Sequence, residues 1–133
     1  MKKRKRKSLK KVGKYKKEFN KNLGIKLPCQ NIYQSEGLKK HVKKRHPGCV
    51  CYIDKIPQII KKPDFIGINP SEQNSIELIK KYNENILVGI KLDKEKGYFY
   101  VASLYSVKDS KVERRLNSGR LKIFKKNLDN KNN

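Results

Sequence analysis

The chain has 133 residues and carries 35 Lys and Arg against 12 Asp and Glu, for a formal net charge of +23. A field of that sign attracts polyanions, meaning RNA, DNA or an anionic membrane surface. No apolar run approaches about 18 residues and no apolar segment follows the basic N-terminus, so the sequence shows neither a membrane span nor a signal peptide. We therefore expect one small cytoplasmic domain whose partner is nucleic acid and not a membrane.

The N-terminal segment is a lysine-rich arm by composition. Residues 1–17 carry eleven Lys or Arg and no acid. We expect residues 1–18 to be disordered or weakly helical until they bind a polyanion. The folded domain then spans residues 19–124, and residues 125–133 form a polar tail.

Residues 34–46 form the first predicted helix. Leu38 and Val42 lie four residues apart, so a helix buries both on one side. Ser35 is the expected N-cap, and Pro47 ends the helix. A short second helix is predicted within residues 52–63, where Ile53, Ile56 and Ile60 follow helical spacing, Pro57 fits a first turn and Pro63 stops the helix.

After residue 63 the apolar pattern changes from helical to alternating, which indicates a sheet. Strands are predicted at 65–68, 75–82, 86–92 and 98–105. One or two helical turns over 109–116, ended by Gly119, then lead to a short edge segment at 120–124. The predicted fold class is α+β, with N-terminal helices packed on a four-stranded antiparallel sheet.

The predicted helix at 34–46 holds both histidines of the chain, His41 and His46. Metal-free cleavage of RNA requires a general base, a general acid and cations beside the phosphate, and His41 has Arg45 four residues away on a neighbouring face. In an ideal helix the two histidines point about 140° apart, so only one lies over the sheet unless the helix ends before His46. The alternative is that both are surface residues of a basic helix that binds phosphate.

The predicted sheet offers partners for these histidines. Lys91 projects from its strand opposite the apolar row, and Ser103 and Tyr105 share one face of the last strand, where they can reach a phosphate or stack on a base. A basic cluster suited to a phosphate clamp follows that strand: Arg114, Arg115, Arg120 and Lys122. The ordinary alternative is that Ser103 and Tyr105 pack within a half-buried sheet and that the basic residues are solvated.

No metal or other cofactor is expected. The only candidate zinc ligands are spaced C-x11-H-x4-H-x2-C-x-C, which matches no common framework, and they are Cys29, His41, His46, Cys49 and Cys51. The twelve acidic residues are scattered, whereas a metal-dependent nuclease needs clustered carboxylates. Free thiols are the default for three cysteines in a reducing compartment.

Several short motifs occur in a recognisable order across roughly residues 34–123. They are His41 with Lys44-Arg45-His46-Pro47, Ile56-Pro57-Gln58-Ile59-Ile60, Pro63-Asp64-Phe65-Ile66, Ser103-Leu104-Tyr105 and Ser118-Gly119-Arg120-Leu121-Lys122. Together they resemble the phage-associated branch of the Barnase–EndoU–colicin–RelE-like (BECR) nuclease superfamily. The resemblance implies helices on a four-stranded antiparallel sheet and a metal-independent endoribonuclease of the kind used as a toxin or in phage and mobile-element conflict. It leaves room for a cognate immunity or antitoxin protein as a partner beside RNA.

The leading hypothesis is therefore an RNA-cleaving enzyme in which the 2′-OH attacks the adjacent phosphate and leaves a 2′,3′-cyclic phosphate. By the resemblance, His41 matches the helix histidine, and Ser103 and Tyr105 match polar positions of the last strand. The expected catalytic residues are His41, His46, Lys91, Ser103 and Tyr105, and the expected phosphate-binding residues are Arg45, Arg115, Arg120 and Lys122. The alternatives are a non-catalytic basic module that binds nucleic acid and an inactive relative that binds a partner protein.

Overall fold

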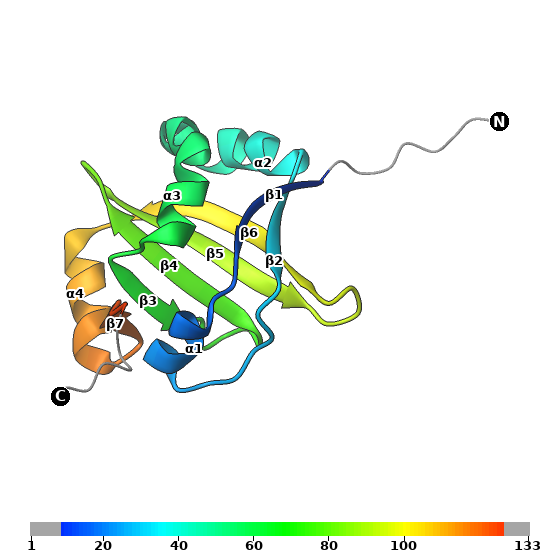
Figure 1. Cartoon of the computed structure of the whole chain (residues 1–133). Helices are drawn as coiled ribbons and strands as arrows, with labels where there is room; N and C mark the ends of the chain where they lie inside the picture. The colour runs from blue at the N-terminus through cyan, green and yellow to red at the C-terminus, as the bar shows by residue number, and fades with distance from the viewer. Residues whose placement is uncertain (1–8, 127–133) are drawn as a thin grey trace.

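A seven-stranded mixed sheet forms the centre of the protein, in the order β1-β2-β6-β5-β4-β3-β7 (Figure 1). The computed structural model describes residues 9–126, so residues 1–8 of the predicted arm and 127–133 of the predicted tail lie outside the described residues. The strands are β1 (Leu9–Lys14), β2 (Asn31–Ser35), β3 (Phe65–Ile68), β4 (Ser75–Lys81), β5 (Asn85–Asp93), β6 (Tyr98–Val107) and β7 (Leu121–Ile123). The helices are α1 (Lys17–Leu23), α2 (Gly37–Arg45), the 3-10 helix η1 (Pro47–Lys55), α3 (Ile56–Lys61) and α4 (Asp109–Ser118).

The predicted α+β class is confirmed, but the prediction of four strands is wrong. Strands β3 to β6 form the antiparallel meander that the alternating pattern predicted. The sheet is extended on one side by β7, which pairs with β3, and on the other by β2, which runs parallel to β6. The β2–β6 pairing joins only Ile32 to Phe99 and Tyr33 to Tyr100, so it is too short to leave a clear alternating pattern in the sequence.

Part of the predicted basic arm belongs to the folded sheet. Strand β1 pairs with β2, and Tyr15, which follows β1, is fully buried. The Tyr15 ring stacks on Phe99 with a centroid distance of 4.5 Å, and its hydroxyl donates to Asn20 Oδ1 over 2.8 Å. Burial also raises the pKa of the Tyr15 phenol above its usual value. The lysines of β1 concealed this strand, because only Val12 and Tyr15 supply buried apolar surface there.

The main core lies between the sheet and α1, α2 and α3. Leu38 and Val42 of α2 are both buried, as their spacing predicted, and Pro57 lies in the first turn of α3. The isoleucines of α3 pack with the inward residues of β4, β5 and β6 in one cluster that includes Ile56, Ile59, Ile60, Ile76, Leu78, Val88, Ile90, Phe99 and Leu104. No helix within residues 9–126 is both long and apolar enough to cross a membrane.

The other sheet face is covered only at one end. Helix α4 packs against it through Val112 and Leu116, in a small cluster with Ile79, Leu87, Val107 and Leu121. Figure 1 shows α4 and β7 together at one side of the sheet and α2 and α3 together at another. We call this second face the open face. It carries Lys91 of β5 and Ser103 and Tyr105 of β6. Tyr105 pairs with Leu87 across the strands, Lys91 lies on the same face of β5 as Leu87, and Ser103 lies on the same face of β6 as Tyr105.

A β-bulge in β6 determines which side chains reach the open face. Gly89 pairs with Ser103, but the next residue, Ile90, pairs with Val101, so Ala102 has no partner on β5. The bulge reverses the alternation, so Val101 does not share a face with Ser103, as strict alternation along the strand would require. Val101 turns to the core, and Tyr100 joins Ser103 on the open face.

Helix α2 starts and ends differently from the prediction in ways that matter for the histidines. Ser35 ends β2, and Glu36 occupies the N-cap position without a side-chain hydrogen bond. The helix ends at Arg45, and His46 adopts the non-helical angles φ −139° and ψ 62° before Pro47 begins η1. His46 is therefore free of the 140° offset that an uninterrupted helix would impose.

If β1 and Tyr15 are part of the cooperative fold, then Tyr15→Ala should lower the free energy of unfolding by about 3–5 kcal/mol, because a fully buried aromatic ring is removed. Urea denaturation followed by circular dichroism measures this change. The matched control is Lys10→Ala, an exposed position of the same strand, for which we expect a change within about 0.5 kcal/mol. Equal stability of the Tyr15→Ala protein and the wild type would contradict the inclusion of β1 in the folded unit.

Candidate active site

A buried carboxylate lies at the centre of the open face. Glu77 of β4 is 2% exposed, and its neighbours across the sheet are Gly67 on β3 and Gly89 on β5. A Cβ on Gly67 would collide with the backbone carbonyl of Arg120, and a Cβ on Gly89 would lie 2.6 Å from Ser103 Oγ. The Gly67 position therefore requires glycine, so that the chain after α4 can approach the row that holds Glu77, whereas a side chain at Gly89 would displace the Ser103 hydroxyl from that row.

Two arginines surround this carboxylate. Arg120 donates from Nε to Glu77 Oε1 over 3.2 Å and from Nη2 to Oε2 over 2.8 Å, which is a bidentate ion pair. Arg115 Nη1 lies 4.0 Å from Glu77 Oε1; it is buried and has no hydrogen-bond partner. The group as a whole carries one excess positive charge and an unsatisfied buried donor. The Arg115 and Arg120 side chains remain 15% and 27% exposed, so the excess positive charge is accessible from the open face.

The end of α4 sets the spacing of the two arginines. Gly119 adopts a left-handed conformation with φ 87°, and its N–H donates to the carbonyl of Leu116. The Ser118 hydroxyl donates to the Arg115 carbonyl and accepts from the Arg120 N–H, over 3.1 and 3.3 Å. This turn brings Arg120 back across the sheet, so that both guanidinium groups reach the same carboxylate.

His46 reaches the open face from the end of α2. Its ring stacks on Tyr105 with a centroid distance of 5.4 Å and an interplanar angle of 30°. Tyr105 packs against the α4 cluster and lies two residues beyond Ser103 on the same strand face. Because α2 ends at Arg45, His46 lies over the sheet. The sequence allowed this position only if the helix ended before His46.

His41 and Lys91 line one pocket beside the part of β6 that precedes Ser103, away from Tyr105. The pocket has a volume of about 430 Å³ and is lined by Ser35, Gly37, Leu38, His41, Glu72, Lys91, Tyr100, Val101 and Ala102. His41 is exposed, and Lys91 Nζ lies 3.6 Å from Glu72 Oε1. The two histidines therefore flank the stretch of β6 that contains Ser103, one near Ala102 and the other on Tyr105.

Two of the predicted phosphate-binding residues do not join this arrangement. Lys122 pairs with Ile66, which belongs to the main core, so its side chain lies on the face away from Glu77. It lines a separate pocket beside Asn22 and Lys125. Arg45 is exposed at the end of α2, and no contact places it at the Glu77 cluster. Arg115 and Arg120 are the basic residues of the predicted clamp that converge.

Glu77 was missed in the sequence because the acidic residues were judged only by their clustering. The available signal was local: Glu77 is a single acidic residue that interrupts the apolar run Ile76, Leu78 and Ile79. Gly67 and Gly89 within neighbouring strands were a second signal, since glycine in a strand interior marks the close approach of another group.

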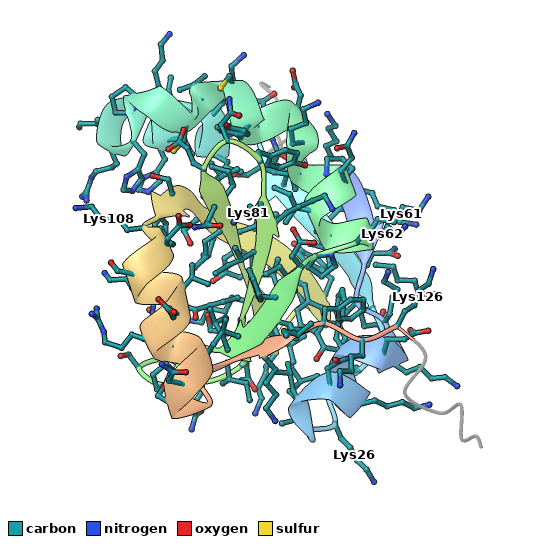
Figure 2. All side chains as sticks on the ribbon, turned by 90° about the vertical axis from the view of Figure 1, so that its left-hand side faces the viewer. Lys26, Lys61, Lys62, Lys81, Lys108 and Lys126 are labelled. Atoms are coloured by element: carbon teal, nitrogen blue, oxygen red, sulfur yellow. The ribbon has the colours of Figure 1, made fainter. Side chains whose placement is uncertain are left out.

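Basic charge alone does not locate this site. Exposed lysines occur on many elements, and Figure 2 labels examples from loops, from α3, from β4 and from the segments flanking α4 and β7: Lys26, Lys61, Lys62, Lys81, Lys108 and Lys126. Charge that is spread over several sides supports general attraction of polyanions. The buried ion cluster and the two histidines distinguish the open face from the rest of this surface.

The residues weighed as candidate zinc ligands do not assemble in the part of the chain that the structure describes. No three His, Cys, Asp or Glu side chains within residues 9–126 form a group that could hold a metal ion. The three cysteines are unpaired: Cys49 is buried, while Cys29 and Cys51 are exposed.

The model of one protein family matches residues 10–114, and that family is described as phage-Barnase-EndoU-ColicinE5/D-RelE like nuclease3. The matched stretch runs from β1 into α4 and includes Glu77, both histidines, Lys91 and Ser103. It confirms the family resemblance inferred from the motifs. No curated protein and no solved structure matches the chain.

The Glu77 cluster should contribute strongly to stability, because removing one partner of a buried ion pair leaves uncompensated charge. We expect Glu77→Ala to lower the free energy of unfolding by about 3–5 kcal/mol. Chemical denaturation measures the change. Glu72→Ala is the matched control, since Glu72 is an exposed acid paired with Lys91, and its loss should cost no more than about 1 kcal/mol. Similar small effects of both substitutions would contradict the buried ion cluster.

Proposed function

Because the chain belongs to the phage Barnase–EndoU–ColicinE5/D–RelE-like nuclease family, we propose that it is a metal-independent endoribonuclease. In the proposed reaction the ribose 2′-oxygen attacks the adjacent phosphorus and the bond from phosphorus to the 5′-oxygen breaks. The products are a 2′,3′-cyclic phosphate and a 5′-hydroxyl. The observation that carries this proposal is the paired arginine cluster on the open face, which shares a row across the strands with Ser103, the residue that the two histidines flank.

Phosphate binding is assigned to Arg115, Arg120 and Lys91. Negative charge accumulates on the phosphoryl oxygens as the 2′-oxygen attacks, and fixed cationic donors stabilise it most when they need no reorganisation. The Arg115 and Arg120 side chains are 15% and 27% exposed, so an anion on the open face can approach both, and Arg120 is held by two hydrogen bonds. Glu77 is nearly inaccessible to a substrate, so we treat it as a positioning residue for the two guanidinium groups.

Proton transfer is assigned to His41 and His46. One imidazole removes the proton of the 2′-OH and the other protonates the departing 5′-oxygen, as general base and general acid. His41 lies in the middle of α2 and His46 directly after its last residue, so the two imidazoles approach the Ser103 stretch of β6 from different points. This arrangement suits an in-line reaction, in which the entering and leaving oxygens lie on opposite sides of phosphorus. Ser103 and Tyr105 lie on the strand between the two histidines, where they would orient the phosphate and hold the His46 ring.

The family also bears on the biological setting of the proposed activity. The phage association of the family supports a role as a toxin or in phage and mobile-element conflict, inside a bacterial cell. Unpaired cysteines suit a reducing compartment such as the cytoplasm. A cognate immunity or antitoxin protein would then be the expected partner beside RNA.

The first test is cleavage of total RNA in excess EDTA by purified protein. We expect cleavage to persist in EDTA, to leave 2′,3′-cyclic phosphate ends, and to fall by about 10²- to 10⁴-fold in His41→Ala and in His46→Ala. Lys39→Ala, an exposed position of the same helix, should cleave like the wild type. Intact RNA together with tight, salt-sensitive binding by all four proteins would instead identify a non-catalytic nucleic-acid-binding module.

A second test separates the acid from the base. A ribonucleoside 3′-phosphodiester with a 4-nitrophenolate leaving group needs little protonation of that group. The variant that lacks the general acid should therefore recover most of the wild-type rate on this substrate, while the variant that lacks the general base should remain slow on both substrates. Equal defects of His41→Ala and His46→Ala on the activated substrate would contradict separate roles for the two histidines.

A further inference from the structure

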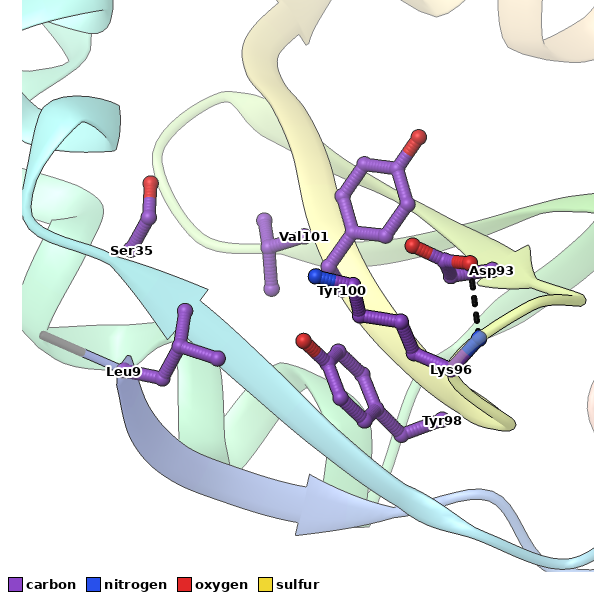
Figure 3. A pocket seen from close by; sticks show the side chains of 7 residues that line it. All are labelled: Leu9, Ser35, Asp93, Lys96, Tyr98, Tyr100 and Val101. Atoms are coloured by element: carbon purple, nitrogen blue, oxygen red, sulfur yellow. Dashed lines mark hydrogen bonds between the residues drawn. The ribbon is translucent and has the colours of Figure 1, made fainter. Parts of the chain in front are cut away.

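A second pocket on the open face adjoins the one that holds His41 and Lys91. It has a volume of about 670 Å³ and is lined by Leu9, Ser35, Asp93, Lys96, Tyr98, Tyr100 and Val101 (Figure 3). We call it the tyrosine groove. Ser35, Tyr100 and Val101 line both pockets, so the two are continuous along β6. Its volume lies within the range of sites that enclose ligands of nucleotide size.

The continuity gives the groove a place in the substrate path. Tyr100 pairs across the strands with Lys91, and Tyr98 pairs with Asp93 at the hairpin. Successive residues on one strand face lie about 7 Å apart, which is close to the spacing of nucleotides along an extended single strand. A chain whose phosphate lies at Lys91 would therefore place the next nucleotide beside Tyr100 and Tyr98.

The tyrosine rings are arranged as stacking surfaces. Tyr98 and Tyr100 are only partly buried, so each ring retains exposed area. Tyr33 of β2 contacts Tyr98 edge to face, with a centroid distance of 4.9 Å and an interplanar angle of 72°, and this contact restricts the Tyr98 ring. Bases stack on such rings in proteins that bind single strands, and a ring held in advance loses little entropy on binding.

The charges around the groove favour an anionic ligand that carries a base. Lys96 and Lys91 lie along it, and Figure 3 shows the Lys96 side chain beside Tyr98 and Tyr100. Asp93 Oδ1 accepts from the backbone N–H groups of Glu95 and Lys96, so that oxygen is occupied by the hairpin turn. Leu9 also lines the groove. In the sequence, Leu9 is separated from the basic run 2–7 by one residue.

We propose that the tyrosine groove is a subsite for an unpaired nucleobase of RNA, next to the phosphate that is cleaved, and that Tyr98 and Tyr100 stack on that base. This inference rests on the proposed function for the neighbouring phosphate site. It makes the protein prefer single-stranded RNA, because a base in a duplex must first unpair and unstack before it can enter the groove. The groove positions the substrate and takes no part in proton transfer.

The test uses oligonucleotides with one cleavable ribonucleotide in a DNA strand, followed or preceded by either a normal base or an abasic site. Removal of the stacked base should lower wild-type kcat/KM by about 5- to 150-fold on one side of the ribonucleotide only. Tyr98→Leu and Tyr100→Leu should show the same loss on the normal strand and no further loss on the abasic strand. Tyr98→Phe and Tyr100→Phe should retain wild-type kcat/KM, because the ring remains.

The control is Tyr82→Leu, since Tyr82 is a half-buried tyrosine that contacts Tyr52 away from this groove. It should cleave both strands like the wild type, and circular dichroism should show that all variants fold. Equal cleavage of normal and abasic strands by wild type and Leu variants would overturn the subsite and leave the nuclease proposal standing.

A binding measurement keeps the two proposals separate. Fluorescence anisotropy with a 2′-O-methyl oligonucleotide, which cannot be cleaved, reports the groove without catalysis. If RNA is never cleaved but binding still depends on the base and on Tyr100, the subsite is supported and the nuclease proposal fails. If binding is independent of both, the subsite is overturned whatever the outcome for cleavage.

Discussion

The arrangement of the open face depends on the ion cluster around Glu77. A carboxylate that is almost wholly buried in a strand is tolerated only because Arg120 pairs with both of its oxygens and Arg115 lies close by. The same contacts tie the segment after α4 to the middle of the sheet. They fix two guanidinium groups at the centre of a face that would otherwise be an ordinary half-covered β-sheet.

Much of the fold follows from apolar periodicity, and the parts that do not have physical reasons. The meander β3 to β6 was predictable because each strand contains a stretch of alternating or consecutive apolar residues, and α2 because Leu38 and Val42 are spaced for one buried side. Strand β1 was not predictable from its lysines: its place comes from long-range pairing with β2 and from the burial of Tyr15 after it.

The candidate site was predictable in its residue types but not in its geometry. His46 could be placed over the sheet only by knowing that α2 ends at Arg45, and Tyr100 only by knowing of the bulge at Ala102. Glu77 carries no motif, since its significance depends on arginines that lie about 40 residues later in the chain. Lys122 shows the converse error, in which a basic residue close in sequence to Arg120 faces the other side of the sheet.

The order of these residues along the chain has a consequence for how the protein is made. The histidines, Glu77, Lys91 and Ser103 precede α4, whereas Arg115 and Arg120 follow from its last turn onward. Domains form from the N-terminus during synthesis, so a nascent chain that ends before residue 115 has neither arginine. Until the last turn of α4 has been added, Glu77 therefore lies in the chain without either of the guanidinium groups that offset its charge, so the ion cluster of the open face can form only at that late stage.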